Sequence, residues 1–158
     1  MTQDALFEDG AEKPLRLIAQ DPDDLQIISS LSQDAVFPLP EMSWRPSKRS
    51  FAILLNRFRW EDAQTAKDRD RDFERVQSVL EFGDVLAVKS QGIDRSQTDL
   101  IMSLLAIEWI AGEDGTGTIA LTLAGDGSIE LSVECIEVRL LDVTRPYVAP
   151  SRMIPEHD

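Results

Sequence analysis

The chain has 158 residues, a length suited to one hydrophobic core, and its 42% hydrophobic and 28% charged residues predict one globular domain. Its formal net charge of -13 repels phosphate backbones and anionic head groups, so nucleic-acid and membrane-surface binding are not expected. The longest apolar runs, Phe51–Leu55 and Leu104–Ile107, fall far short of the roughly 18 residues of a membrane-spanning helix.

The N-terminal part predicts an acidic tail, a strand and one helix. Met1–Lys13 is polar and is expected to be mobile, whereas Leu15–Ala19 has the composition of a strand. Asp21 fits the N-cap and Pro22 the first position of a helix over Pro22–Gln33. Its apolar positions recur at three-residue spacing at Leu25, Ile28 and Leu31, which leaves Gln26, Ser29, Ser30 and Gln33 for solvent.

A hairpin is predicted in the next segment. Prolines make Val36–Glu41 an extended connector or an edge strand. Met42–Arg45 and Ser50–Arg59 flank a proline-containing bend and should pair as a β-hairpin. The charged stretch Trp60–Asp72 is interpreted as a solvated loop, with a short surface helix as the alternative.

The middle of the chain predicts three more strands. Phe73–Phe82 and Val85–Ser90 are separated by Gly83-Asp84, the pattern of a tight hairpin. Gln91–Asp99 is polar and is expected to form a loop. Leu100–Ala111 is almost entirely apolar, which favours a strand buried on both faces, with a helix as the alternative.

The clearest hairpin lies near the C-terminus. Apolar residues alternate with polar or small ones in Thr118–Ala124 and Ser128–Glu134, on either side of Gly125–Gly127. Cys135–Val143 continues the two-residue period and is interpreted as a strand, although one or two helical turns also fit. Tyr147–Asp158 contains prolines and predicts an extended tail.

Together these elements predict an α+β, mainly β fold with eight or nine strands and one N-terminal amphipathic helix. Such a sheet must close or fold over to protect its edges, so we expect a partly open β-barrel or a two-layer antiparallel structure. A pleckstrin-homology-like barrel is one version. The expected domain spans residues 14–145, between tails at residues 1–13 and 146–158.

The counts of reactive residues exclude several kinds of site. Cys135 is the only cysteine and His157 the only histidine, which excludes an internal disulfide, most zinc sites and most nucleophile–histidine pairs. No metal, cofactor or catalytic residue is therefore predicted. The acidic start, with Asp4, Glu8 and Asp9, lacks a signal-peptide pattern, so a cytoplasmic location is expected.

The most informative stretch for function is Ser50–Trp60. In a regular strand Arg57 and Arg59 share a face with Phe51, Ile53 and Leu55, so either a bulge near Asn56 shifts the phase or the row reaches a rim. A rim would offer paired guanidinium groups to an anion. The predicted binding residues are Asn56, Arg57, Arg59, Trp60 and Arg75. In the alternative, the arginines pair with Glu61, Asp62 or nearby acids.

Four blocks carry a resemblance to a known family. They are Phe51–Glu61, Phe73–Val76, Val85–Lys89 with Gly92-Ile93, and Val133–Leu140. In these blocks, and above all in Asn56–Glu61, the chain resembles an uncharacterised bacterial family that carries a domain of unknown function. The resemblance implies a bacterial, single-domain cytosolic protein with no assigned activity, and it supplies no catalytic residues.

The sequence therefore favours a non-enzymatic binding or protein-interaction module that recognises an anionic group through an arginine-lined rim. The expected partner is another protein or a small anionic ligand. An enzyme that uses carboxylate and arginine chemistry in a barrel pocket is the alternative, and homodimerisation through an exposed strand is a third hypothesis.

Overall fold

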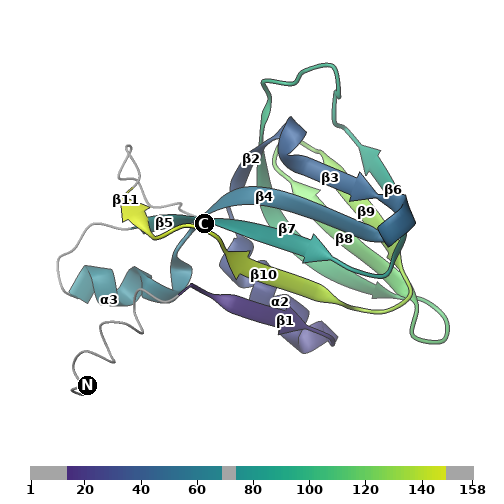
Figure 1. Ribbon diagram of the computed structural model, residues 1–158, viewed down its shortest axis with the longest axis horizontal. Helices are drawn as coiled ribbons and strands as arrows, with labels where there is room; N and C mark the ends of the chain where they lie inside the picture. Colours follow the sequence, from purple (N-terminus) through teal and green to yellow (C-terminus); the bar gives the residue numbers. More distant parts are fainter. Residues whose placement is uncertain (1–13, 69–73, 149–158) are drawn as a thin grey trace.

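The computed structural model describes residues 14–68 and 74–148, which form one antiparallel sheet of 11 strands (Figure 1). The strand order is β1-β10-β5-β4-β2-β7-β8-β9-β6, with β11 paired to β5 and β3 paired to β4. The strands are β1 (Arg16–Ala19), β2 (Val36–Pro38), β3 (Met42–Arg45), β4 (Ser50–Phe58), β5 (Glu74–Phe82), β6 (Val85–Gln91), β7 (Ile101–Ala111), β8 (Gly117–Leu123), β9 (Ser128–Val133), β10 (Val138–Asp142) and β11 (Tyr147–Val148). The helices are α2 (Pro22–Ser32) and the short α3 (Ala63–Asp68), with 3-10 turns η1 (Leu39–Glu41), η2 (Pro46–Lys48) and η3 (Trp60–Asp62). The mainly β, antiparallel prediction with an N-terminal helix is confirmed.

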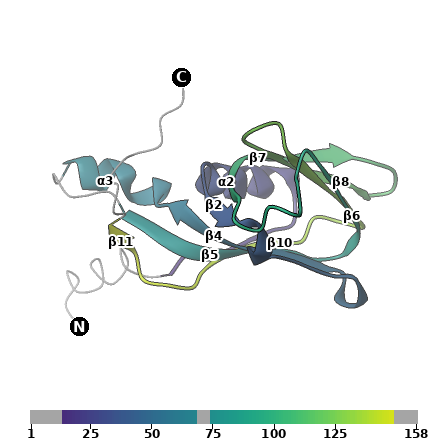
Figure 2. The same cartoon turned by 90° about the horizontal axis from the view of Figure 1, so that it is seen from above.

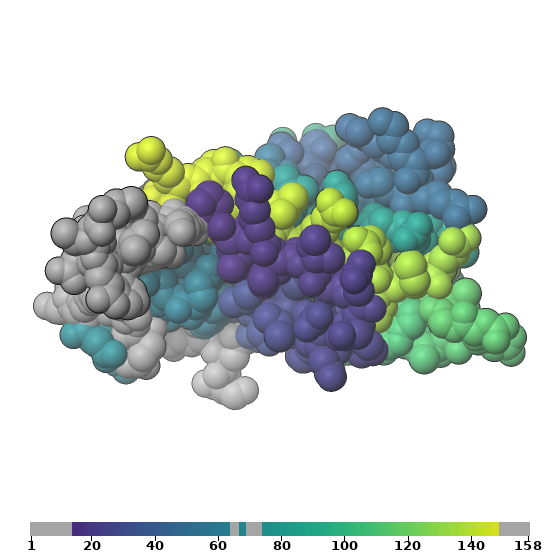
Figure 3. All heavy atoms as spheres, turned by 60° about the horizontal axis from the view of Figure 1, so that its bottom comes forward, coloured from purple at the N-terminus to yellow at the C-terminus, as the bar shows by residue number. Residues whose placement is uncertain are grey.

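The sheet folds over into two layers and does not close into a barrel (Figure 2). The front layer consists of β1, β10, β5, β4 and β3, and the back layer of β7, β8, β9 and β6. β1 lies at the outer edge of the front layer, where its dark purple atoms are visible at the surface (Figure 3). The finer expectation of a pleckstrin-homology-like arrangement stays a prediction.

β2 joins the two layers. Val36 pairs with Asn56 of β4 and with Ser103 of β7, so this strand lies inside the sheet. The expectation of a connector or edge strand over Val36–Glu41 was wrong in this respect. The prolines limit the length of the strand, because Pro38 ends it and η1 follows, but they do not move it to an edge.

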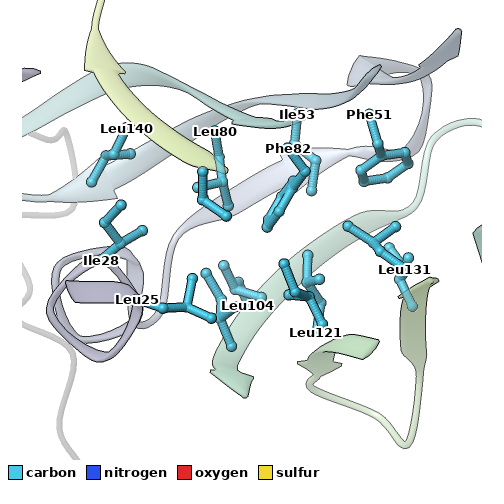
Figure 4. Close-up of a cluster of buried hydrophobic side chains, with 14 of the residues drawn as sticks. Leu25, Ile28, Phe51, Ile53, Leu80, Phe82, Leu104, Leu121, Leu131 and Leu140 are labelled. Carbon is cyan, nitrogen blue, oxygen red and sulfur yellow. The ribbon is translucent and has the colours of Figure 1, made fainter. Parts of the chain in front are cut away.

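The core lies between the layers, where the inward side chains of both meet those of α2 (Figure 4). Alternate residues of the longer strands point inward, which places one apolar face of each of these strands in this space. Buried members are Ile53, Leu80 and Leu140 from the front layer, Leu104, Leu121 and Leu131 from the back layer, and Leu25 and Ile28 from α2. Each fully buried aliphatic side chain stabilises the fold by about 1.5–3 kcal/mol.

Helix α2 begins as its sequence predicts. The Asp21 carboxylate accepts a hydrogen bond of 2.8 Å from the backbone N–H of Asp24, and Pro22 occupies the first turn. Ser29 was expected to face solvent, but it is buried and its Oγ accepts a hydrogen bond of 2.9 Å from the N–H of Ile107. The reason is that β7 leaves this N–H without a strand partner, and a short hydroxyl side chain on α2 satisfies it.

The predicted hairpin between β5 and β6 was wrong, although both strands exist. β5 lies between β4 and β10, whereas β6 pairs with β9. At the bend, Gly83 N–H donates to the Glu137 carbonyl and Val85 N–H donates to the Arg49 carbonyl, while Asp84 has φ +53°. These hydrogen bonds stabilise a bend at which the chain passes from the front layer to the back layer, so β6 does not pair with β5.

β7 is a strand, as predicted, but it is buried on one face only. Met102, Leu104 and Ile107 point into the core, while Ile101 and Ile110 are exposed. The strand reads as apolar on both faces because its outer face carries isoleucines at the surface. The predicted hairpins β3–β4 and β8–β9 are confirmed.

Two open alternatives are resolved by the structure. The stretch from Trp60 to Asp68 is helical, as η3 and α3, rather than a loop, and residues 69–72 lie outside the described range. Within Cys135–Val143 the ordered element is the strand β10.

The predicted tails are largely untested, because residues 1–13 and 149–158 also lie outside the described range. Tyr147 and Val148 of the predicted C-terminal tail pair with β5 as β11. No helix in the described part of the chain is long and apolar enough to cross a membrane.

Candidate functional site

Arg57 lies inside the molecule at the end of β4 and is completely enclosed. Its Nη1 and Nη2 donate to Glu61 Oε1 and Oε2, each at 2.8 Å. Its Nε and Nη2 donate to Asp142 Oδ1 at 3.1 and 3.0 Å, and Nη2 also reaches Oδ2 at 3.0 Å. Ser78 Oγ accepts from Nε and donates to Asp142 at 2.7 Å. We call Arg57, Glu61, Ser78 and Asp142 the Arg57 cluster.

The pattern of β4 explains why an arginine is buried here. The pairing of β4 with β5 continues without a break from Phe51 to Phe58, so no bulge shifts the phase near Asn56. Arg57 therefore stays in the inward row of Phe51, Ile53 and Leu55 rather than reaching an exposed rim. It can remain there because two carboxylates and a hydroxyl accept its hydrogen bonds.

Arg57 and Glu61 shift each other's pKa in favour of the ion pair. Burial alone would raise the pKa of Glu61, but the hydrogen bonds and charge of Arg57 outweigh it and hold that pKa below its usual value. Burial also opposes the charge of Arg57, yet the hydrogen bonds and charges of Glu61 and then Asp142 raise its pKa above the ordinary value. Both shifts favour the charged forms of Arg57 and Glu61 at neutral pH.

Arg59 has a similar environment at the start of η3. Its Nη1 lies 2.7 Å from Glu74 Oε1 and 3.4 Å from Asp62 Oδ2, and the side chain is almost completely buried. Both arginines thus meet carboxylates of the chain itself, as in the alternative that paired them with Glu61, Asp62 and nearby acids. They form no exposed pair of guanidinium groups.

The other predicted residues lie nearby but do not converge on one point. Trp60 donates its Nε1–H to the Gln33 carbonyl at 2.9 Å and packs edge-on against Phe58, with ring centroids 4.7 Å apart. Asn56 donates its side-chain amide to the hydroxyl of Tyr147, a residue that sequence reasoning did not select.

Arg75 differs from Arg57 and Arg59 in its environment. Its Nη1 makes only long contacts of 3.5 and 3.4 Å with the backbone oxygen and Oδ1 of Asn56. Among the described residues it has no carboxylate partner, and it is half-buried. It is therefore the arginine of the predicted set that remains accessible to an external anion.

The outer face of the front layer carries an apolar row that sequence reasoning missed. Leu54, Val79 and Leu141 lie side by side on β4, β5 and β10, and Arg16 of β1 follows next to Leu141. Ile18 and Val143 lie on the same face by alternation and are 54% and 53% exposed. We call this set, with Arg75 and Arg139, the outer front face. No helix covers it in the described part of the chain (Figures 1 and 2).

The central row on the outer face of the back layer is polar, although Leu86, Ile101 and Ile110 are exposed on its strands. This cross-strand row contains Glu108, Ala120, Glu130 and Lys89. Thr122 lies beside this row and is exposed. Polar residues facing solvent are the usual arrangement for an antiparallel sheet, and the row of Leu54, Val79 and Leu141 departs from it across three neighbouring strands. The signal in the sequence was that β4 contains adjacent apolar residues, Leu54 and Leu55, which cannot share one face.

The acidic side chains of the described residues are dispersed, and the single thiol is hydrogen-bonded. Three or more His, Cys, Asp or Glu side chains that could hold a metal ion do not come together in residues 14–68 and 74–148. The single thiol, Cys135, donates to Asp84 Oδ2 at 3.2 Å, and this hydrogen bond, with burial and nearby acids, raises the pKa of the thiol. A raised pKa keeps the thiol protonated and weakens it as a nucleophile.

Comparisons with known proteins place the chain in a family but not in a functional class. Searches of curated proteins and of solved structures found no match. The model of a family described as a protein of unknown function, DUF2948, matches residues 15–157. The chain therefore belongs to the DUF2948 family.

Proposed function

We propose that this protein is a non-enzymatic protein-interaction module of the cytoplasm that binds a partner protein on its outer front face. The observation that carries the proposal is the unbroken row of Leu54, Val79 and Leu141 across three neighbouring strands of a face that no described helix covers. These three side chains are half-buried, and Ile18 and Val143 on the same face are exposed. Contiguous apolar surface of this kind is typical of interaction sites.

The residues around the row suit a protein interface. Burial of aliphatic surface contributes about 25 cal/mol per Å² removed from water. Arg16, Arg75 and Arg139 add guanidinium groups at the margins, and arginine is enriched at interfaces. Arg139 makes a long ion pair of 3.7 Å with Glu137, and Arg16 has no ion pair among the described residues. These cations would recognise acidic groups of the partner.

The enzyme alternative receives less support from the Arg57 cluster. Its guanidinium already donates to Glu61, Ser78 and Asp142, so a substrate would have to displace a carboxylate of the chain. Displacement would leave Asp142, whose side chain is 4% exposed, as a buried charge without its cation. The cluster is better explained as a structural element whose hydrogen bonds hold the end of β4 next to β5 and β10.

A pair of matched variants tests the proposal. Val79→Thr combined with Leu141→Thr replaces two aliphatic side chains of the row and keeps residues that favour strands. The control is Ile110→Thr, the same kind of change at an exposed aliphatic residue, 54% exposed, on the back layer. Each tagged protein is purified from the cells that make it, and the bound polypeptides are quantified after urea denaturation has established that the variants fold.

We expect the double variant to retain at least about tenfold less partner than the wild-type protein, which is equivalent to a loss of about 1.4 kcal/mol in binding free energy. Ile110→Thr should retain the wild-type amount. Equal retention by all three proteins would exclude the outer front face as the interface. Light scattering on the wild-type protein provides a second check. A dimer that dissociates in the double variant would assign the face to self-association instead of to a different partner.

A further inference from the structure

We propose that the partner adds an extended, acidic segment as a new strand along the free edge of β1. The inference rests on the proposed function, because the added strand would continue the outer front face. β1 is the end of the sheet and pairs only with β10 among the described strands. Its atoms lie open at the surface in Figure 3.

The pairing of β1 identifies the backbone groups that remain unpaired. Leu15 accepts a hydrogen bond of 2.9 Å from the Asp142 N–H, which makes these two residues a hydrogen-bonded pair. In an antiparallel ladder such pairs alternate along the strand. Leu17 and Ala19 therefore face β10, and the N–H and C=O groups of Arg16 and Ile18 point away from the sheet.

Two other edge strands of the sheet, β6 and β3, carry features that oppose strand addition. The pairing of β6 with β9 has an irregularity between Val85 and Ala87, and Lys89 lies exposed in the same strand. β3 ends at Pro46, where η2 begins. Bulges, lysine and proline are features that oppose strand addition. Arg16–Ala19 contains none of these three, and its four residues limit an added strand to a short one.

The geometry of the edge also defines the side chains that the partner strand needs. Residues opposite Arg16 and Ile18 would point to the outer front face, because paired residues share a face. A side chain of the added strand would then extend the row of Leu54, Val79, Leu141 and Arg16. It would lie next to the Arg16 guanidinium, which has no ion pair among the described residues. A carboxylate fits that position, and an aliphatic residue fits the position opposite Ile18, which is 54% exposed.

Charge favours this partner over a second copy of the chain. Antiparallel self-pairing centred on Leu17 would place Arg16 opposite Ile18 of the other copy and bring no carboxylate to the guanidinium. A carboxylate on a strand from another protein would lie next to the Arg16 guanidinium, which has no ion pair among the described residues.

The first test measures amide hydrogen exchange by NMR in the isolated full-length protein. We expect fast exchange at Arg16 and Ile18 and protection at Leu17 and Ala19. Protection of Arg16 and Ile18 that persists on dilution would show that another segment of the chain already covers the edge. Protection that grows with concentration would assign the edge to a second copy. Either result would overturn the proposal.

The second test titrates a defined probe, the peptide acetyl-Thr-Val-Thr-Glu-Thr-amide, and follows the backbone amides. We expect saturable shifts at Arg16 and Ile18 with millimolar affinity, at least fivefold weaker binding when the glutamate is replaced by lysine, and no saturable shift when the valine and glutamate nitrogens are methylated. The substitution Arg16→Glu should reverse the preference between the acidic and basic peptides. Equal binding of all peptides, or shifts confined to other strands, would refute strand addition.

Failure of the edge proposal can be distinguished from failure of the proposed function. If the peptide leaves β1 unchanged while Val79→Thr with Leu141→Thr still releases the partner, the partner uses the outer front face without adding a strand. If neither experiment responds, both the strand addition and the outer front face are wrong.

Discussion

The substitution Arg57→Met should destabilise the protein strongly, because it removes a buried cation and leaves its partners charged. Methionine fills much of the space of the arginine side chain but donates no hydrogen bonds. Asp142, whose side chain is 4% exposed, would keep only the hydroxyl of Ser78 and the N–H of Leu15 as donors. Glu61 is 29% exposed and can recover part of its hydration.

The magnitude follows from the burial of the pair. Removal of one partner from a buried ion pair costs about 3–5 kcal/mol, which is a large part of the 5–15 kcal/mol that stabilises a typical domain. At about 2 kcal/mol per molar urea, the unfolding midpoint should fall by roughly 1.5–2.5 M. Adding Asp142→Asn to Arg57→Met removes the buried, unpaired charge of Asp142 and keeps a hydrogen-bond acceptor. The protein with both substitutions should therefore recover at least half of the lost stability.

Urea denaturation at pH 7, with tryptophan fluorescence as the signal for unfolding, measures these differences in midpoint. The control is Arg139→Met, because Arg139 is half-exposed and its carboxylate lies 3.7 Å away. A pair of this kind is worth about 0–1 kcal/mol, so the control should change the midpoint little. If Arg57→Met unfolds within about 0.5 M of the wild-type protein, the cluster does not stabilise the fold in the way argued above.

Three further outcomes follow from the same structure. The pKa of Glu61 is lowered in the folded state, so ionised Glu61 stabilises the fold fully above the usual pKa of a glutamate. This stabilisation is lost as the pH falls through the pKa of Glu61 in the folded state. Glu61→Gln should therefore flatten the fall in urea midpoint between pH 6 and pH 3. Asp84→Asn should speed the reaction of Cys135 with a thiol reagent at pH 8, because it removes the hydrogen bond and charge that raise the pKa of the thiol. Gly117→Ala should lower stability by about 1–3 kcal/mol, because a Cβ there would lie 2.4 Å from the Trp109 ring and 2.6 Å from the Ile110 carbonyl oxygen.

Each of these outcomes has a control and a contrary result. A pH profile of Glu61→Gln that parallels the wild-type profile would exclude a role for this carboxylate in acid unfolding. Asp126→Asn, a change in the β8–β9 turn, should leave the thiol rate unchanged, and equal acceleration by both variants would indicate a general charge effect. An unchanged melting temperature for Gly117→Ala would contradict the close packing of Gly117 against Trp109 and Ile110.

Local patterns in the sequence predict the elements of this fold well. The alternation of Ile119, Leu121 and Leu123 around a glycine bend predicts both the β8–β9 hairpin and its buried face, because all the necessary information lies within a few residues. The same is true of the Asp21 cap of α2. Glu61 could be proposed as a partner of Arg57 because the two are four residues apart.

Contacts between distant parts of the chain could not be read in this way. Asp142, the other carboxylate of the Arg57 cluster, is 85 residues away from Arg57. Whether β5 turns back onto β6 or crosses to the other layer depends on the Glu137 and Arg49 carbonyls, which receive the backbone hydrogen bonds at the bend. The aliphatic row of the outer front face likewise exists only because β4, β5 and β10 are neighbours, and β10 is remote in sequence from β4.

The most direct test of the outer front face as the interface is site-specific photo-crosslinking in the cells that make the protein. A benzoylphenylalanine placed at Val143 reports on this face, and one placed at Ile110 reports on the back layer with nearly the same exposure, 53% against 54%. We predict a discrete crosslinked partner from position 143 and none from position 110. Crosslinks from position 110 alone, or the same products from both positions, would contradict the assignment of the interface to this face.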